Sequence, residues 1–222
     1  MKAVATLVVA ALISVAAATS TAATSNLRPG IAKLTRTQAH AIQRSGEWHP
    51  GCPVSPGQTR LVTARYYGFD HATHLGQIVV NRAVAVSVLR TFRKLYAMRF
   101  PIREMSFDAV YGPHPFQDED LTASFECRNA GASPCTGKVS TNNWSMHAYG
   151  EAIDLNPREN PYVGCGMTRD KTALAYLNRR NVRPGMVTRA IYRKTFATVG
   201  WGWGGLWSGS TKDYMHFSIN GH

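Results

Sequence analysis

The sequence predicts an α+β domain in which helices pack on a small antiparallel sheet. Residues 82–98 show the clearest helical periodicity, and several short segments alternate apolar and polar side chains as strands do. The 222 residues are enough for one well-packed domain and few for two. No internal repeat or linker divides the chain, so we expect a single domain over residues 24–222, with a helical extension up to about residue 50.

In the N-terminal half, residues 34–44 read as a short helix, and residues 61–67 and 77–80 read as strands. Residues 82–98 form the strongest helical segment, because apolar side chains recur every three or four positions while the arginines and lysine face away. Pro101 prevents this helix from continuing.

In the C-terminal half, residues 105–111 are expected to form a strand that leads into a long polar loop. Residues 150–156 alternate and stop at a proline, which indicates another strand. Helices are expected over residues 171–180 and 188–199, and a last strand over residues 214–219.

Residues 1–23 have the features of a secretory signal peptide. Lys2 precedes an apolar run over residues 3–15, and small residues that suit cleavage follow it. The apolar run is too short to span a bilayer, and no other segment is long enough. We therefore expect a secreted protein, extracellular or associated with the cell wall, with an uncleaved anchor as the alternative.

Export changes how the four cysteines are interpreted, because an oxidising compartment favours disulfides. None of the four stands in a Cys-x-x-Cys pair, so a cysteine zinc site is not expected. Cys127 and Cys135 flank a short loop rich in small residues, which could be closed locally. That choice would pair Cys52 with Cys165.

The chain is strongly basic, with 25 Lys and Arg against 13 Asp and Glu, a formal net charge of +12. Anionic polymers of the bacterial envelope are therefore possible partners, and a simple solubilising role of the charge is the alternative. The basic residues are scattered along the sequence, so specific binding to nucleic acid is not expected. We expect a monomer.

Two motifs carry chemistry. The first contains His147 and Asp154, and the second contains Asp213 and His216. A catalytic zinc usually has three protein ligands and leaves a fourth position to water. His147, Asp154 and His216 suit the three ligand positions, and Asp213 lies close enough in sequence to act on the water.

The chain resembles the zinc D-Ala-D-Ala carboxypeptidase family, which includes VanY-type peptidases and L-alanyl-D-glutamate endopeptidases and shares its fold with the hedgehog signalling domain. The resemblance covers roughly residues 50–220. It is carried mainly by Ser145-x-His147-x-x-Gly150-x-Ala152-x-Asp154, by Asp213-x-x-His216, by Phe125-Glu-Cys-Arg128 and by Gly200-Trp-Gly-Trp-Gly-Gly205.

This resemblance implies a hedgehog-like and peptidase-like α+β fold, one Zn²⁺ on His147, Asp154 and His216, and a general base at Asp213. Many relatives have Glu at the position of this base, so the aspartate weakens the carboxypeptidase label. Arg128 is the best match to an arginine that stabilises the developing oxyanion.

Three residues are expected to contact substrate, namely Ser145, Tyr149 and Trp203. Ser145 could instead cap the local turn. The tryptophans of the Gly-rich segment 200–207 could instead pack in the core.

The function expected from these residues is hydrolysis of peptide bonds in the stem peptides of peptidoglycan by a secreted zinc metallopeptidase of the D-Ala-D-Ala carboxypeptidase type. An L-alanyl-D-glutamate-type endopeptidase that lyses walls is one alternative. A zinc-stabilised wall-binding domain without turnover is the other, and Asp213 argues against it because a binding domain needs no base beside the metal.

Overall fold

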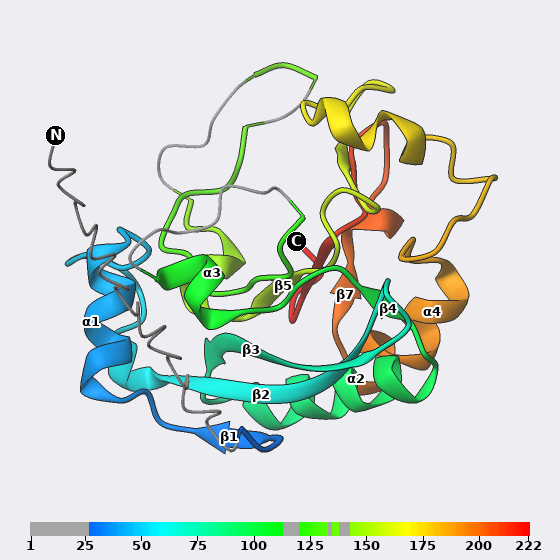
Figure 1. Cartoon of the computed structure of the whole chain (residues 1–222). Coiled ribbons are helices and arrows are strands. Elements are labelled where there is room, and N and C mark those ends of the chain that lie inside the picture. The colour runs from blue at the N-terminus through cyan, green and yellow to red at the C-terminus, as the bar shows by residue number, and fades with distance from the viewer. Residues whose placement is uncertain (1–26, 113–119, 133–134, 138–142) are drawn as a thin grey trace, which may run out of the picture.

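The structure is a computed structural model that describes residues 27–112, 120–132, 135–137 and 143–222 (Figure 1). The expected signal peptide lies outside these described residues. Within them, no helix combines the length and the apolar character that crossing a membrane would require.

The larger sheet confirms the expected N-terminal strands and extends them. Strands β1 (Gly30–Ala32), β2 (Thr59–Gly68) and β3 (Thr73–Asn81) pair antiparallel in that order, and the short β4 (Pro101–Ile102) pairs parallel with β2. Figure 1 shows the long strands β2 and β3 crossing the lower half of the molecule above helix α2.

The two faces of this sheet pack against different helices, as the pleat requires. Val62 and Ile78 lie in a large apolar cluster with α2 (Ala85–Ala97), whereas their neighbours Leu61 and Val79 lie in a second cluster with α1 (Arg36–Arg44). Both helices were expected from their periodicity. The expected α+β class with a small antiparallel sheet and packed helices is confirmed.

The strand expected over residues 105–111 was wrong, because residues Phe107–Tyr111 form the short helix α3. Ser106 caps this helix, and its Oγ accepts a hydrogen bond from the Ala109 amide at 3.3 Å. Phe107 and Tyr111 are four residues apart, so both rings lie on one side of the helix and are buried in the second cluster.

The two helices expected near the C-terminal end are shorter than predicted. Residues Lys171–Tyr176 form only a 3₁₀ helix, η3. The segment expected as one helix over 188–199 divides into α4 (Arg189–Lys194) and η4 (Phe196–Val199) at Thr195. The buried Thr195 hydroxyl donates to the Ile191 carbonyl at 2.7 Å, a bond that competes with regular helical geometry.

Two smaller sheets carry the C-terminal motifs. Strand β9 (His216–Ser218) lies between β5 (Ala152–Asp154) and β7 (Gly202–Trp203), antiparallel to both. Strands β6 (Tyr162–Val163) and β8 (Lys212–Asp213) form a separate pair. The expected strands at 150–156 and 214–219 are thus present with shorter bounds.

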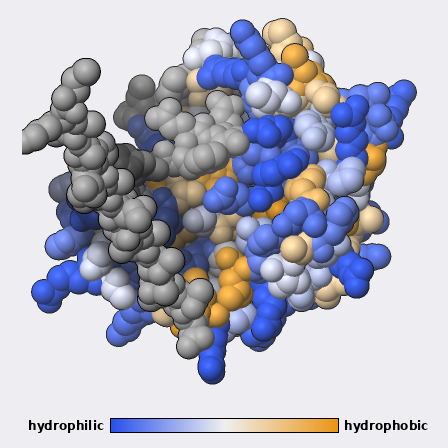
Figure 2. Space-filling model, in the orientation of Figure 1, coloured by the Kyte–Doolittle hydropathy of each residue, from blue (hydrophilic) through white to orange (hydrophobic). Residues whose placement is uncertain are grey.

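Short 3₁₀ turns complete the fold, namely η1 (Pro56–Gln58), η2 (Met146–Tyr149) and η5 (Gly204–Leu206). The small three-stranded sheet is joined to the large sheet through the apolar cluster that contains α2, since Ile153 and Phe217 are fully buried in it. On the face shown in Figure 2, hydrophilic side chains predominate among the described residues, and apolar ones form small separate areas.

All four cysteines form disulfides, but the expected pairing was wrong. Cys52 pairs with Cys127, and Cys135 pairs with Cys165. The Cys127 amide donates to the carbonyl of Glu47 at 3.0 Å, so Cys127 lies against the segment that contains Cys52. Tertiary contacts therefore place Cys127 and Cys135 in different neighbourhoods, although the loop between them is short.

We expect a peptide map of the unreduced protein to contain the cross-linked pairs Cys52–Cys127 and Cys135–Cys165, because their Cα atoms lie 5.9 and 5.4 Å apart, within the range a disulfide needs. Thiol titration after denaturation without reductant should give close to zero. A Cys127–Cys135 peptide, or two reactive thiols per chain, would contradict the observed arrangement.

Candidate metal centre

His147 lies on turn η2 and is only 3% exposed. Its Nδ1 lies 2.6 Å from the carbonyl oxygen of Ser124. A carbonyl oxygen can only accept, so Nδ1 donates and the neutral ring presents the lone pair of Nε2 to the opposite side. In metal sites, a histidine ligand commonly donates its other ring N–H to a backbone carbonyl in this way, which fixes the orientation of the ring.

Asp154 and His216 are brought together by strand pairing. They are direct partners in the antiparallel register of β5 with β9, and their neighbours Ile153 and Phe217 point into the core. Because side chains alternate along a strand, Asp154 and His216 lie on the opposite face, which is the face toward His147. The distance from His216 Nδ1 to Asp154 Oδ1 is 3.2 Å.

The three side chains converge on one point. His147 Nε2 lies 3.2 Å from Asp154 Oδ2 and 3.3 Å from His216 Nδ1. A tetrahedral zinc with ligands at about 2.0–2.1 Å has its donor atoms about 3.3–3.4 Å apart. The contacts of Asp154 use different oxygens, Oδ2 towards His147 and Oδ1 towards His216. The spacing between donor atoms of different residues is therefore close to that around a single zinc ion. The three side chains also form a group able to hold a metal ion among the described residues.

The pKa shifts of Asp154 and His216 are those expected of a site that binds a cation. Burial alone would raise the pKa of Asp154, but the charges and hydrogen bonds of His147 and His216 outweigh it and hold the pKa below its usual range. Burial would lower the pKa of His216, yet the hydrogen bond and charge of Asp154, with the charge of Asp213, raise it. Both shifts arise mainly from the attraction between the Asp154 carboxylate and the imidazole rings beside it.

Asp213 lies on β8, opposite Tyr162 of β6, and lines the same cleft as the three donors. Its Oδ1 is buried and has no hydrogen-bond partner among the described residues. Burial and the charge of Asp154 raise its pKa to about 7, against the opposing charges of His216 and Arg128. Asp213 packs closely against Gly204, because a Cβ added to Gly204 would lie only 2.8 Å from Asp213 Cβ.

Arg128 lines the cleft as well. Its Nε donates to Glu126 Oε2 at 2.6 Å, and its Nη1 donates to the carbonyl of Asn129 at 3.3 Å. Burial lowers the pKa of Arg128, but the charges of Glu126, Asp154 and Asp213 outweigh this effect and raise it. The guanidinium is therefore a permanent cation that Glu126 orients beside the candidate ligands.

The cleft that contains these residues has a volume of about 700 Å³, within the range of ligand-binding pockets. Ser145 and the half-buried Tyr149 both line it. The Ser145 Oγ accepts a hydrogen bond from the His147 amide at 3.3 Å and so caps the turn that holds His147. This contact gives Ser145 a structural role whether or not it also contacts a substrate.

Trp203 does not reach the cleft. It is 5% exposed, stacks on Phe217, and donates from Nε1 to the carbonyl of Tyr214 at 2.8 Å. The structure gives Trp203 a packing role in the core, and the substrate contact expected for it has no support from this cleft. Trp207 lies at the cleft instead, with its ring 6.0 Å from the ring of His216 and stacked on His222. The sequence signal for Trp207 was the Gly-rich aromatic segment, which did not indicate which tryptophan faces the cleft.

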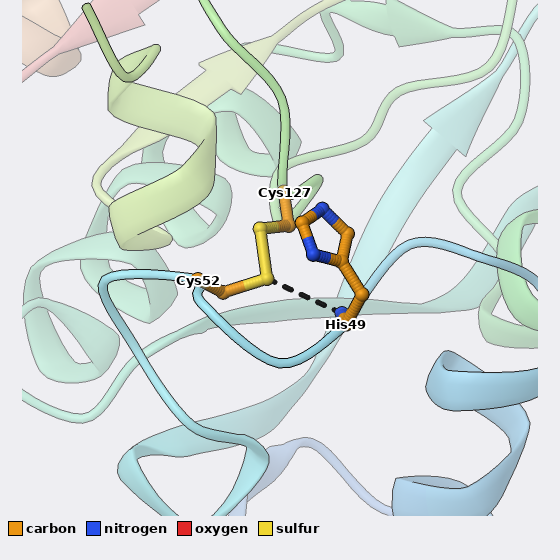
Figure 3. A group of neighbouring side chains, drawn as sticks. All are labelled: His49, Cys52 and Cys127. Carbon is orange, nitrogen blue, oxygen red and sulfur yellow. Dashed lines mark hydrogen bonds between the residues drawn. A yellow bond between two sulfur atoms is a disulfide. The ribbon is translucent and has the colours of Figure 1, made fainter. Parts of the chain in front are cut away.

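A second group of possible ligands consists of His49, Cys52 and Cys127, which Figure 3 shows side by side. The two sulfurs are joined in a disulfide, and Cys52 Sγ accepts a hydrogen bond from the His49 amide at 3.2 Å. No thiolate is available in this group, so it lacks the donors of a metal site.

The sequence model of a family described as D-alanyl-D-alanine carboxypeptidase matches residues 138–219. The matched part contains His147, Asp154, Asp213 and His216, and it supports the family resemblance indicated by the motifs. The match points to a peptidase, a class of hydrolase. No curated protein and no solved structure matches the chain.

Gly150 provides a test of the local geometry that positions His147. It ends turn η2 with φ 65°, and an added Cβ would lie 2.7 Å from the Asn81 amide nitrogen. Gly150→Ala should lower the free energy of unfolding by at least about 1 kcal/mol more than Gly166→Ala does in urea denaturation. Gly166 is the matched control because it has φ 76° with nothing near its added Cβ. Equal losses would show that Gly150 is not closely packed.

Proposed function

We propose that the chain is a secreted zinc peptidase of the D-Ala-D-Ala carboxypeptidase type, which hydrolyses peptide bonds in the stem peptides of bacterial cell wall. The observation that carries this proposal is the convergence of three metal-binding side chains beside Asp213, a carboxylate that has a buried oxygen without a hydrogen-bond partner among the described residues. A domain that only binds would not need a base at that place.

His147, Asp154 and His216 would hold the zinc. Two imidazoles and one carboxylate form a common donor set of catalytic zinc, and they leave a position for water or substrate. A bound zinc ion would polarise the scissile carbonyl and lower the pKa of an attacking water towards about 7. The hydrogen bond from His147 to Ser124 would hold the ligand ring in the required tautomer.

Asp213 would accept the proton of the attacking water and then pass it to the leaving amine. With no cation in the cleft, burial and the charge of Asp154 raise the pKa of Asp213 to about 7. A cation held by the three donors would lower this value, because a positive charge favours the ionised carboxylate. Asp213 would then be ionised and ready to accept the proton.

Arg128 would stabilise the negative charge that develops on the carbonyl oxygen of the scissile bond. A guanidinium already fixed by Glu126 needs little reorganisation when that charge appears, and this is the condition under which such groups contribute most. The backbone carbonyl of Arg128 also accepts a hydrogen bond from the Ser145 amide at 3.0 Å. The arginine segment and the turn that carries His147 are thereby held together.

The location and the substrate are part of the same proposal. A protein with net charge +12 is attracted to the anionic polymers of a cell wall, and this attraction should weaken with salt. Release of the terminal D-Ala is the favoured reaction, because the family match carries the carboxypeptidase description. Cleavage inside the stem peptide is the alternative to be tested.

We expect about one zinc per chain in the purified protein by elemental analysis. His147→Ala and His216→Ala should each lose stoichiometric metal, since each removes one of only three protein ligands. His74→Ala serves as a matched control, because His74 pairs with Asp70 on the β2–β3 hairpin, outside the cleft. A full equivalent of zinc in either cleft variant would contradict the ligand assignment.

Asp213→Ala should keep its zinc and lose about a hundred- to ten-thousandfold in turnover, because it removes a proton acceptor and not a ligand. Asp108→Ala, which removes an exposed carboxylate from α3, should leave the rate unchanged. Turnover of the Asp213 variant within a fewfold of the parent would refute the role of this residue.

Digestion of purified peptidoglycan and of a soluble pentapeptide stem tests the reaction itself. Mass spectrometry should detect release of free D-Ala, with the glycan chains intact. A new internal amine such as N-terminal D-Glu, without released D-Ala, would identify an endopeptidase. Absence of both products from the zinc-loaded protein would contradict a peptidase function on this substrate.

A further inference from the structure

A second cavity, of about 380 Å³, borders the segment that carries Asp213. Asp213 and Met215 line the metal cleft, whereas Tyr214 between them lines this cavity. The two spaces share no lining residue among those that the structure describes, so the cavity is separate from the candidate metal centre. The apolar part of its wall consists of Val182, Met186, Val187, Trp203 and Gly205.

Arg179 lines this cavity, and uncharged groups hold its guanidinium in place. The guanidinium donates to the carbonyl oxygens of Glu159 and Val187, at 2.8 and 2.7 Å, and to Asn160 Oδ1 at 3.1 Å. Its Cζ lies 4.2 Å from the centre of the Tyr214 ring, which also lines the cavity. The charged end of Arg179 therefore lies at the cavity wall, and its Nε–H has no acceptor among the described residues.

No carboxylate among the described residues balances the charge of Arg179. Glu159 offers it only a backbone carbonyl, because the Glu159 carboxylate pairs with Arg103 at 2.7 Å. Burial lowers the pKa of Arg179 to about 10, whereas acidic neighbours outweigh burial at Arg103 and Arg128 and raise the pKa there. A partly buried cation without a counter-charge is unfavourable, and a bound anion would supply one.

The surroundings of the cavity carry further positive charge. Arg189 is exposed and also lines the cavity, and no acidic residue among the described ones does so. Residues 171–212 contain five arginines and three lysines, and no aspartate or glutamate. This part of the surface therefore attracts anions, and the cavity offers them a defined place to bind.

We propose that this cavity binds the phosphate groups of an anionic wall polymer, at a site distinct from the site of hydrolysis. Arg179 and Arg189 would each donate a charge-assisted hydrogen bond to a phosphate oxygen. The tetrahedral oxygens of a phosphate can accept from two guanidinium groups that belong to different elements. The apolar wall would contact the carbon chain that links one phosphate to the next.

Such a site would hold the enzyme on the wall while a stem peptide occupies the metal cleft. The segment 213–215 separates the two spaces, so both can be occupied at once. This inference rests on the proposed function for the identity of the polymer. Phosphate binding itself can be measured without any peptide substrate.

The experiment measures dissociation constants by calorimetry with the full, zinc-loaded chain at low salt. The probes are a short oligomer of glycerol phosphate and an oligoglutamate of the same charge. Arg179→Gln and Arg189→Gln each remove one cation from the cavity. Arg36→Gln is the matched control, because it removes one exposed cation of α1 that lies outside the cavity.

We expect the parent protein to bind the glycerol phosphate oligomer more tightly than the oligoglutamate. Arg179→Gln and Arg189→Gln should each weaken phosphate binding at least about tenfold, as the loss of one charge-assisted hydrogen bond allows. Arg36→Gln should stay within about twofold of the parent. Hydrolysis of a short soluble stem peptide by Arg189→Gln should be unchanged, because Arg189 does not line the metal cleft.

An equal loss of phosphate binding in Arg36→Gln and Arg189→Gln would overturn the proposal, since only net charge would then matter. Full binding in both cavity variants would place the phosphate elsewhere, as at the zinc, and tighter binding of the oligoglutamate would indicate another polymer. Arg189 is exposed, so its variant decides even if Arg179→Gln does not fold. Phosphate binding without hydrolysis of any stem peptide would refute the peptidase function and leave this site intact, whereas hydrolysis without phosphate binding would do the reverse.

Discussion

The antiparallel pairing of β5 with β9 is the constraint on which the candidate metal centre depends. It joins segments 62 residues apart in sequence and places Asp154 directly opposite His216. The same register buries Ile153 and Phe217 in the core, so a slip by one residue would move both polar side chains into the apolar cluster. The free energy of core packing therefore fixes the register that brings the two donor residues together.

The third donor depends on contacts with the larger sheet. The Asn81 amide, at the end of β3, donates to the Gly150 carbonyl at 2.8 Å, and the Asn81 side chain donates to the carbonyl of Tyr149. These bonds anchor the turn that carries His147, while Ser124 orients its ring. The large sheet thus acts as a rigid support, and the site lies where it meets the small sheet, as precise catalytic geometry requires.

Much of the fold and of the site could be predicted from the sequence, because the signals were local. The amphipathic α2 and the alternating β2 and β3 follow from periodicity, and His147, Asp154, Asp213 and His216 follow from short motifs.

The predictions that failed did so because contacts that local sequence patterns do not reveal decided the structure. The segment 105–111 became a helix through the Ser106 cap, and the cysteines paired by three-dimensional proximity instead of loop length. Burial of Trp203 likewise depends on which side of β7 meets the core, whereas Trp207 follows η5 and lines the cleft.

The central claim is that one zinc ion binds where His147, Asp154 and His216 converge. Anomalous diffraction from crystals of the purified protein, recorded on both sides of the zinc absorption edge, tests this most directly. The account predicts a single strong peak at about 2.0–2.1 Å from His147 Nε2, His216 Nδ1 and an oxygen of Asp154. A fully loaded zinc at other residues, such as the exposed histidines, with this cleft empty, would contradict it.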